Sequence, residues 1–350
     1  MKILNVYKWA TMGGVERVLL NRAHAIKKFG FGSGNIKFDV FFLHDSGGKQ
    51  GFINYVYNNG LQNIVRIVDK VIDKQYDLIF SIDTPDILDL VDVTKTYIEC
   101  HTSYVKNREY LKHLPPNIRG ILVPSDHFRE EIINEIPKHL KTKLNVLTNY
   151  VYVSPTVEKL TNRRIFSKIP IIYIGRIDRL KNVEEIVRVV SAFNESYSDR
   201  LILILAGAII EHEVDLNKIL KLHGMESRTI YLPPINFEKV WSLLLLVKEH
   251  NGVFMSASFQ ESFGLSVAEA MRCGLPVLLL DNVAHRNLVN NDESFLFKPN
   301  SINETASKLS LILENYKHYV DTIVNYSMLL ERKFVMNWKQ LLQHKEKEFE

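Results

Sequence analysis

Two glutamates at a fixed spacing could bind one elongated ligand. The stretch ESFGLSVAEAMRCGLPVLLLD, residues 261–281, places Glu261 eight positions before Glu269. The pattern predicts a loop with Gly264 at its turn and a short helix closed by Gly274, whose free N-terminal amides favour an anion such as a diphosphate. Eight helical residues rise about 12 Å, so the carboxylates would reach hydroxyl groups on both sides of that diphosphate. The alternative is that Glu261 is a solvated loop residue and Glu269 an ordinary helix surface residue.

Two cations are expected at the same edge of the same sheet. The segment YIGRIDRLKN, residues 173–182, predicts a strand that ends at Gly175 and a loop that leads into a helix. Arg176 and Lys181 lie in that loop, where they would neutralise a departing diphosphate near Glu261. A diphosphate with hydroxyl groups on both sides describes a nucleotide sugar. The alternative is a solvated basic loop.

The first half of the chain offers fewer chemical groups. Gly13 and Gly14, in WATMGGVERVLL, follow a predicted strand and open a helix, which lets a backbone approach a ligand closely. No G-x-G-x-x-G pattern occurs there, which disfavours a nicotinamide enzyme. His101 ends a predicted strand at the ligand edge of its sheet, although a lone histidine is more often structural. Residues 104–120 are basic with interleaved tyrosines and would meet an anionic acceptor, lipid headgroups or only solvent.

Composition favours a two-domain globular protein. The chain has 350 residues, 46% of them hydrophobic, and a net charge of +4. This mild positive charge permits an anionic ligand, but it is far weaker evidence than the concentrated basic stripe of a nucleic-acid-binding protein. Cys100 and Cys273 stand alone in apolar stretches and are expected to be reduced core thiols. The N-terminus resembles no signal peptide, and the apolar run at 201–210 is shorter than the roughly 20 residues of a membrane helix. We therefore expect a cytoplasmic protein, with peripheral contact to the inner face of the membrane left open.

Strand-length apolar runs alternate with helical segments through most of the chain. Runs that are apolar throughout suit strands buried on both faces of parallel sheets. The alternation weakens between about 150 and 170, which predicts a linker. The fold class is therefore α/β, with two Rossmann-like doubly wound domains, 1–155 and 165–327, facing a central cleft. The tail from about 302 is predicted to be helical.

In chain order, these elements resemble glycosyltransferase family 4, the retaining transferases of GT-B fold. The resemblance rests on GGVERV, ECHTSY, ILVPSDHFREEI, YIGRIDRLKN and SFQESFGLSVAEAMRCGLPVL. The last segment is the most specific, because it keeps the family's E-x7-E pattern and its Phe-Gly-Leu interior. The chain departs from the family in NVAHRNLVNN, where His285 and Arg286 replace glycines and a glutamate, and at Asn149, which Tyr150 follows instead of glycine. The family's last helix, here about 328–350, packs back on the first domain.

The resemblance assigns roles to individual residues. It implies that four residues are catalytic: His101 beside the transferred sugar and acceptor, Glu261 on the donor sugar, and Arg176 and Lys181 on the departing nucleotide. It further implies that the donor is bound by Gly13, Gly14, Arg176, Lys181, Leu232, Pro233, Glu261, Ser262, Phe263, Gly264, Leu265 and Glu269. The sequence holds no Asp-x-Asp triplet, so we expect no metal and no cofactor beyond the nucleotide-diphosphate sugar itself.

The activity implied is transfer of a hexose from a nucleotide-diphosphate sugar to an acceptor hydroxyl. Uridine diphosphate is the first choice of nucleotide and guanosine diphosphate the second. The acceptor would be a glycan or a lipid-linked molecule in the assembly of surface polysaccharide, lipopolysaccharide or glycolipid. Two alternatives stay open. A nucleotide-sugar 2-epimerase of the same fold would turn over donor without acceptor, and a non-catalytic transferase-like subunit would be inactive without a partner.

Overall fold

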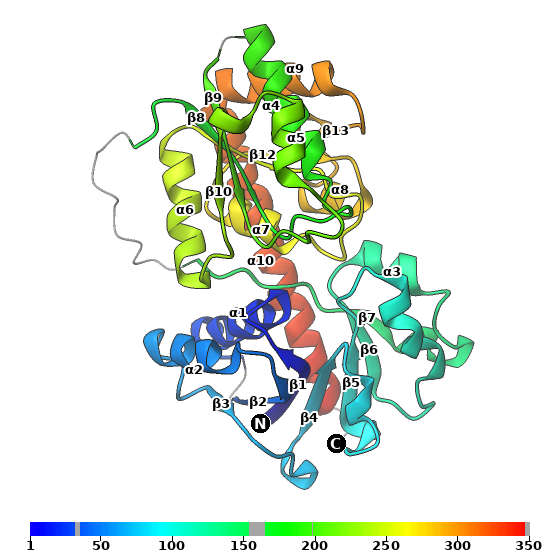
Figure 1. Ribbon diagram of the computed structural model, residues 1–350. Helices are drawn as coiled ribbons and strands as arrows, with labels where there is room; N and C mark the ends of the chain where they lie inside the picture. Colours follow the sequence, from blue (N-terminus) through cyan, green and yellow to red (C-terminus); the bar gives the residue numbers. More distant parts are fainter. Residues whose placement is uncertain (32–35, 154–164, 198, 347–350) are drawn as a thin grey trace. The chain divides into compact units, whose positions relative to one another are not determined.

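The computed structural model describes residues 1–31, 36–153, 165–197 and 199–346 (Figure 1). The chain divides into two compact units. Unit 1 comprises Met1–Tyr152 and Leu330–Glu350, and unit 2 comprises Val153–Leu329. Residues 154–164, at the centre of the predicted linker, lie outside the described residues.

Unit 1 is built on a seven-stranded sheet in which every neighbouring pair is parallel. The strand order is β3-β2-β1-β4-β5-β6-β7. The strands are β1 (Lys2–Ala10), β2 (Lys37–Asp45), β3 (Val65–Ile67), β4 (Leu78–Ile82), β5 (Thr96–Glu99), β6 (Gly120–Val123) and β7 (Leu144–Val146). The α-helices are α1 (Gly14–Phe29), α2 (Lys49–Asn58), α3 (Asp126–Ile132) and the last part of α10 (Tyr316–Glu346).

Unit 2 repeats this plan with six parallel strands in the order β10-β9-β8-β11-β12-β13. The strands are β8 (Ile169–Ile174), β9 (Leu201–Ala206), β10 (Thr229–Leu232), β11 (Val253–Ser256), β12 (Val277–Leu280) and β13 (Leu296–Phe297). The α-helices are α4 (Val183–Tyr197), α5 (Leu216–Leu222), α6 (Phe237–Glu249), α7 (Leu265–Arg272), α8 (Val283–Leu288), α9 (Ile302–Glu314) and the first part of α10. The predicted α/β class with two doubly wound parallel sheets is therefore confirmed.

Each sheet reverses its strand order at one point. In unit 1 the reversal lies between β1 and β4, and in unit 2 between β8 and β11. Ligands of doubly wound sheets bind beyond the carboxyl ends of the strands at this point, because the connections on either side run in opposite directions and leave a crevice. The predicted residues Gly13, Arg176, Lys181 and Glu261 all lie in loops that leave these strands.

The end of α10 packs into the core of unit 1. The Trp338 side chain is fully buried, with its ring centroid 5.9 Å from that of Phe80 and 6.0 Å from that of Phe31. The Asn337 side chain accepts a hydrogen bond of 3.2 Å from the Thr148 amide. An aromatic cluster and a buried amide contact therefore attach this segment to the first unit. The last residues of the predicted segment, 347–350, lie outside the described chain.

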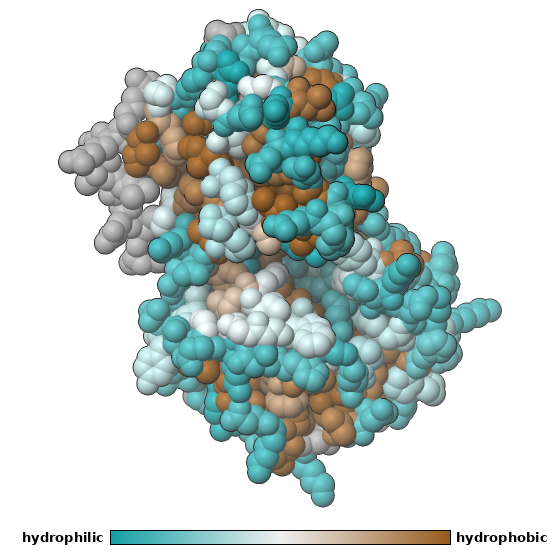
Figure 2. Space-filling model, viewed as in Figure 1, coloured by the Kyte–Doolittle hydropathy of each residue, from teal (hydrophilic) through white to brown (hydrophobic). Residues whose placement is uncertain are grey.

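Hydrophilic residues cover much of the visible face of both units (Figure 2), as expected when apolar strands are buried between helices. Cys100 and Cys273 are both free and buried, which confirms the prediction of core thiols. Among the described helices, none has the length and apolar character needed to cross a membrane.

The basic segment 104–120 is more than a solvated helix face. It contains a 3-10 helix, Val105–His113, in which Arg108 is buried. The Arg108 guanidinium binds the carboxylates of Glu131 and Glu135 at 2.8 and 2.7 Å. The Arg108 cation is therefore neutralised inside unit 1. Its partners lie more than 20 residues away along the chain, so no local sequence pattern indicates this pairing.

The buried His24 side chain should lower the stability of the protein in mild acid. The His24 ring on α1 stacks on Tyr152 with 3.5 Å between ring centroids, and its Nε2 lies 3.1 Å from the Tyr55 hydroxyl. Burial, together with the Lys27 charge, lowers the pKa of His24 to about 3. Below about pH 6.5 the His24 side chain therefore binds a proton in the unfolded protein but not in the folded protein. The contribution of His24 to stability is fully present above that pH and decreases as the pH falls below it.

Between pH 6.5 and 5, this linkage is expected to remove about 2 kcal/mol from the free energy of unfolding, at about 1.4 kcal/mol per pH unit. Urea titrations at the two pH values measure the loss. His24→Gln should lose correspondingly less, whereas His212→Gln, a change at an exposed side chain, should behave like the wild-type protein. An equal acid loss in wild type and His24→Gln would contradict the assignment.

Candidate active site

The loop between β8 and α4 is shaped by its own side chains. Buried Asp178 accepts a hydrogen bond of 2.9 Å from the Lys181 amide, and its other oxygen lies 3.2 Å from the Arg176 guanidinium. The Tyr173 hydroxyl donates to the Arg176 carbonyl at 2.7 Å. These contacts fix the backbone conformation at Arg176 and Lys181, the two predicted cations. The Arg176 side chain remains half exposed.

Lys181 and Glu261 form an ion pair across two loops. The Lys181 Nζ lies 2.6 Å from the Glu261 Oε1, and both side chains are largely buried. The Phe259 amide donates to the Leu180 carbonyl at 3.0 Å, so the backbones of the two loops are joined as well. The loops leave the adjacent strands β8 and β11 at the switch point of unit 2. The alternative of solvated loop residues is therefore wrong for Lys181 and Glu261.

Helix α7 starts at Leu265, directly after Gly264 in the left-handed region with φ of 88°. This conformation suits glycine, and no side-chain hydrogen bond caps this described helix N-terminus. Only the second half of the spacing between Glu261 and Glu269 is helical, so the 12 Å estimated from a continuous helix does not apply. Glu269 is buried inside α7, so the alternative of an ordinary surface residue is wrong for it too.

Gly207, which directly follows β9, packs closely against the end of β8. Gly207 has φ of 144°, and a Cβ there would lie 1.9 Å from the Gly175 carbonyl oxygen, so any side chain would push the ends of β8 and β9 apart. The Gly207 amide donates to the Leu232 carbonyl at 3.0 Å. Part of the Leu232 backbone that we expected to bind the donor is therefore engaged in the sheet, whereas Pro233 is exposed at its edge.

His285 and Arg286, where the sequence departs from the expected family pattern, both lie in α8. His285 is fully buried, and its Nδ1 donates to the Leu280 carbonyl at 2.7 Å. Burial lowers the pKa of His285 although the Glu261 charge opposes this, so the ring is neutral. Its Cδ2 would lie 3.9 Å from a Cβ on Gly264. Arg286 binds both oxygens of Asp281 at 2.6 Å.

In unit 1 the glycine loop already holds an anion. The Glu16 carboxylate accepts hydrogen bonds from the amides of Met12 at 2.9 Å and Gly13 at 3.0 Å, and also from the Thr11 amide. The Gly13 amide that we expected to contact the donor is therefore directed at Glu16. Gly14, the first residue of α1, has open space where a Cβ would stand. Sequence reasoning missed Glu16, although a glutamate three residues after a helix cap is the spacing of a capping box.

His101 lies two residues beyond β5, beside the carboxyl end of β4. Its amide donates to both oxygens of Asp83, at 3.2 and 3.1 Å, and its ring Nε2 lies 3.1 Å from Glu99 Oε2. The Tyr110 hydroxyl donates to Asp83 at 2.9 Å. Asp83 itself has φ of 44°, a strained conformation for a residue other than glycine. His101 is thus held through both its backbone and its ring.

The comparisons with known proteins agree with this geometry. Residues 163–326, nearly all of unit 2, match the sequence model of the family described as glycosyl transferases group 1. Unit 2 is a glycosyltransferase domain.

Two relatives and one solved structure show how far the likeness extends. A protein named probable sucrose-phosphate synthase, from Thermosipho melanesiensis, is 28% identical over 55% of this chain and 46% of its own length. O-antigen chain mannosyltransferase B from Escherichia coli is 26% identical over 56% of this chain and 51% of its own length. The chain thus spans about half the length of these curated relatives. The structure of HepE from Anabaena in complex with UDP and glucose matches 99% of this chain and 100% of that chain with a TM-score of 0.73 and 16% identity, which confirms the predicted GT-B fold.

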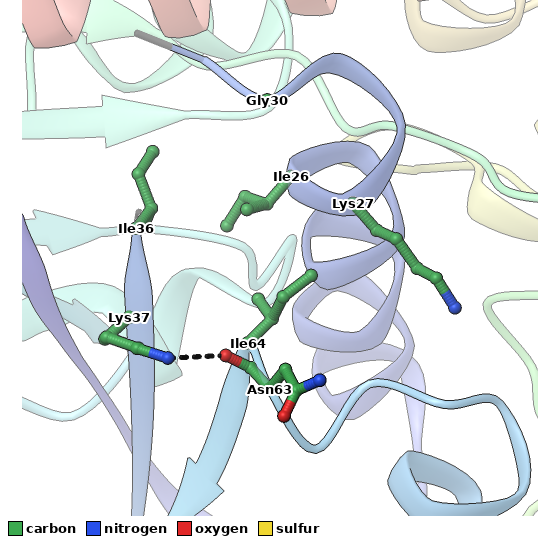
Figure 3. A pocket seen from close by; sticks show the side chains of 7 residues that line it. All are labelled: Ile26, Lys27, Gly30, Ile36, Lys37, Asn63 and Ile64. Carbon is green, nitrogen blue, oxygen red and sulfur yellow. Dashed lines mark hydrogen bonds between the residues drawn. The ribbon is translucent and has the colours of Figure 1, made fainter. Parts of the chain in front are cut away.

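A cavity of about 520 Å³ lies at the amino ends of β2 and β3 in unit 1, away from the carboxyl ends where the predicted site residues lie. Figure 3 shows Ile26 on α1, Ile36 ahead of β2 and Ile64 ahead of β3 around it. The Lys37 ammonium, at its rim, donates to the Asn63 carbonyl at 2.9 Å. This cavity adjoins the amino ends of the strands and contains none of the predicted site residues. In the described part of the chain, no three His, Cys, Asp or Glu side chains gather as they would around a metal ion.

Proposed function

We propose that this protein is a retaining glycosyltransferase of family 4 that moves a hexose from a nucleotide-diphosphate sugar to an acceptor hydroxyl. The observation that carries the proposal is the Lys181–Glu261 ion pair, 2.6 Å long, ahead of the uncapped N-terminus of α7. A cation, a carboxylate and free helix amides together suit a diphosphate that carries a sugar. Their position at the switch point of unit 2 supports the same ligand class.

Each group of the glycosyltransferase domain has a part in this proposal. Lys181 and Arg176 stabilise the negative charge that develops on the departing nucleotide, so no metal ion is required. Glu261, held by Lys181, accepts hydrogen bonds from the sugar hydroxyls, and Glu269 accepts from the ribose hydroxyls. The diphosphate is bound by backbone amides of the α7 loop, namely those of Ser262, Phe263, Gly264 and Leu265.

Unit 1 contributes to the donor sugar and the acceptor. We assign His101 to the transferred sugar and the acceptor hydroxyl, and Gly14 to close backbone contact with the donor. Gly13 shapes the same loop, although its amide binds Glu16 at 3.0 Å. Retention would follow from attack on the face that the nucleotide leaves, with the departing phosphate taking the acceptor proton.

The relatives support the class of substrate. One carries the name of a sucrose-phosphate synthase and another that of an O-antigen chain mannosyltransferase, and the HepE structure holds UDP and glucose. Uridine diphosphate is therefore our first choice of nucleotide and guanosine diphosphate the second. The acceptor in this proposal is a glycan or lipid-linked hydroxyl used in surface polysaccharide, lipopolysaccharide or glycolipid assembly.

A ligand screen followed by a turnover assay tests the proposal. Purified protein is heated with uridine, guanosine or adenosine diphosphate, or their hexose conjugates, with a chelator present throughout. One nucleotide at 100 times its Kd should add about 2.7 kcal/mol to stability and raise Tm by a few degrees. Release of that nucleotide from its sugar should then require an acceptor and persist in the chelator.

Other outcomes would replace the proposal. Conversion of donor without any acceptor would favour a 2-epimerase. No shift with any nucleotide, and activity only with a co-expressed partner, would favour a non-catalytic subunit. Loss of activity with the chelator, restored by a divalent cation, would contradict metal independence.

A further inference from the structure

A buried ionic pair lies directly behind the His101 ring. Arg22, on α1, binds both oxygens of Glu99, on β5, at 2.7 and 2.6 Å. Both side chains are within 1% of complete burial. The Glu99 oxygen nearer to His101 receives two donors, the Arg22 guanidinium at 2.6 Å and the imidazole Nε2 at 3.1 Å. Arg22, Glu99 and His101 thus form one series of hydrogen bonds that runs from α1 through β5 to the loop at the carboxyl edge of the sheet.

Arg22 keeps the Glu99 carboxyl ionised. Burial alone would raise the pKa of the Glu99 carboxyl, but the charge and the hydrogen bonds of Arg22, helped by His101, lower it to about 2. Glu99 is therefore a carboxylate throughout the range in which enzymes work, and a carboxylate only accepts hydrogen bonds. The ring atom beside it, Nε2, must then carry the proton.

The other attachments of His101 leave its remaining nitrogen available. The backbone amide of His101 is bound to Asp83 at 3.1 and 3.2 Å, and the Tyr110 hydroxyl holds Asp83 from the other side. With the backbone anchored and Nε2 donating to Glu99, the Nε2–H tautomer has Nδ1 as its acceptor atom. An acceptor nitrogen at a strand end can take a hydrogen bond from a hydroxyl of a sugar.

We propose that Glu99, neutralised by Arg22, is a positioning residue that holds His101 as the Nε2–H tautomer and so presents Nδ1 to a substrate hydroxyl. The inference rests on the proposed function, because it assigns His101 to a sugar substrate. Glu99 and Arg22 act through His101 and touch no substrate themselves. This is the arrangement by which carboxylates orient histidines in metal sites and catalytic triads.

The tautomer is measurable without any substitution at the buried pair. Nitrogen-15 NMR of uniformly labelled protein at neutral pH, with the His101 signals assigned by comparison with His101→Gln, should show a protonated Nε2 and an unprotonated Nδ1. An Nδ1–H tautomer in the wild-type protein would overturn the proposal. This spectrum does not depend on turnover, so it remains decisive even if the protein transfers no sugar.

Glu99→Gln tests the consequence for catalysis. A neutral amide both donates and accepts, so it no longer selects one tautomer, and His101 should show a mixture. We expect kcat to fall about 10- to 100-fold, by analogy with the loss seen when the partner of a metal-bound histidine is removed, while Kd for the nucleoside diphosphate stays unchanged. Because Glu99→Gln leaves the Arg22 charge without its counter-ion, the double variant Arg22→Met with Glu99→Gln should show the same loss of kcat with a better-preserved fold.

Glu135→Gln is the matched control. It weakens another pair between a buried arginine and a glutamate in the same unit, since Glu135 binds Arg108 at 2.7 Å. It should leave kcat and the His101 spectrum unchanged. Wild-type kcat in both the single and the double variant would overturn the positioning role while the proposed function stands. A wild-type protein that turns over no donor would instead overturn the proposed function, and the NMR spectrum alone would then decide the tautomer.

Discussion

Lys181→Met should lower kcat/KM for sugar transfer by about 100- to 1000-fold, the usual cost of removing one group that stabilises transition-state charge. Methionine keeps most of the length and the packing of the lysine stem, but it removes the cation beside the departing diphosphate. It also leaves Glu261 without the ammonium that lies 2.6 Å away, so a carboxylate that should accept sugar hydroxyls loses its fixed position. The rate of nucleotide release in the presence of acceptor measures the effect.

Lys168→Met provides the control in the same unit. Lys168 pairs with Asp199 at 2.8 Å, and both side chains are partly exposed. Surface pairs of this kind contribute at most about 1 kcal/mol to folding stability, and Lys168 is not among the residues of the proposed site, so kcat/KM should stay at the wild-type value. Wild-type kcat/KM in Lys181→Met would remove Lys181 from the proposed machinery.

The ion pair also predicts non-additivity. Lys181→Met combined with Glu261→Gln should lose less than the product of the two single losses, because each single change already disrupts the interaction that the other residue needs. Losses that multiply would mean that Lys181 and Glu261 act independently in the reaction, although they are in contact in the structure.

Glu269→Ala should weaken binding of the nucleoside diphosphate about 10- to 100-fold, because hydrogen bonds to charged groups contribute about 1.5 to 3 kcal/mol. The proposed partners are the ribose hydroxyls, so the loss should appear in Kd and be the same with and without the sugar attached. Calorimetric titration with the free diphosphate measures it directly.

Glu185→Ala separates this effect from a loss of stability. Glu185 is a second buried glutamate of unit 2, in the first turn of α4, and it accepts the Asn300 amide at 2.6 Å. Its replacement should lower Tm and leave Kd unchanged. An unchanged Kd in Glu269→Ala would contradict the assignment of Glu269 to the ribose.

The sheets and the loop before α7 could be predicted because their signals are local. Uninterrupted apolar runs indicate strands buried on both faces, and Gly264 and Gly274 frame a helix that the structure places at Leu265–Arg272. Both signals span fewer than 15 residues. The sequence alone was therefore enough to place Glu261 ahead of a helix N-terminus.

Pairings between distant segments could not be predicted. Lys181 and Glu261 are 80 positions apart, and Arg22 and Glu99 are 77 apart. Arg22 reads as an ordinary residue of a helix surface, and only the strand that lies behind it makes it a core residue. The order of the strands in the sheet determines which charged side chains come into contact. The local sequence pattern of a helix does not indicate that order.

The Glu16 carboxylate fixes the conformation of the loop before α1 in the absence of any ligand. Its bonds to the amides of Thr11, Met12 and Gly13 do within the chain what a bound anion does in many glycine-rich loops. Loops that become ordered only on binding lose part of their affinity to that ordering. Here the ordering belongs to folding itself, so in the proposed function the contact between this loop and the donor would be preorganised.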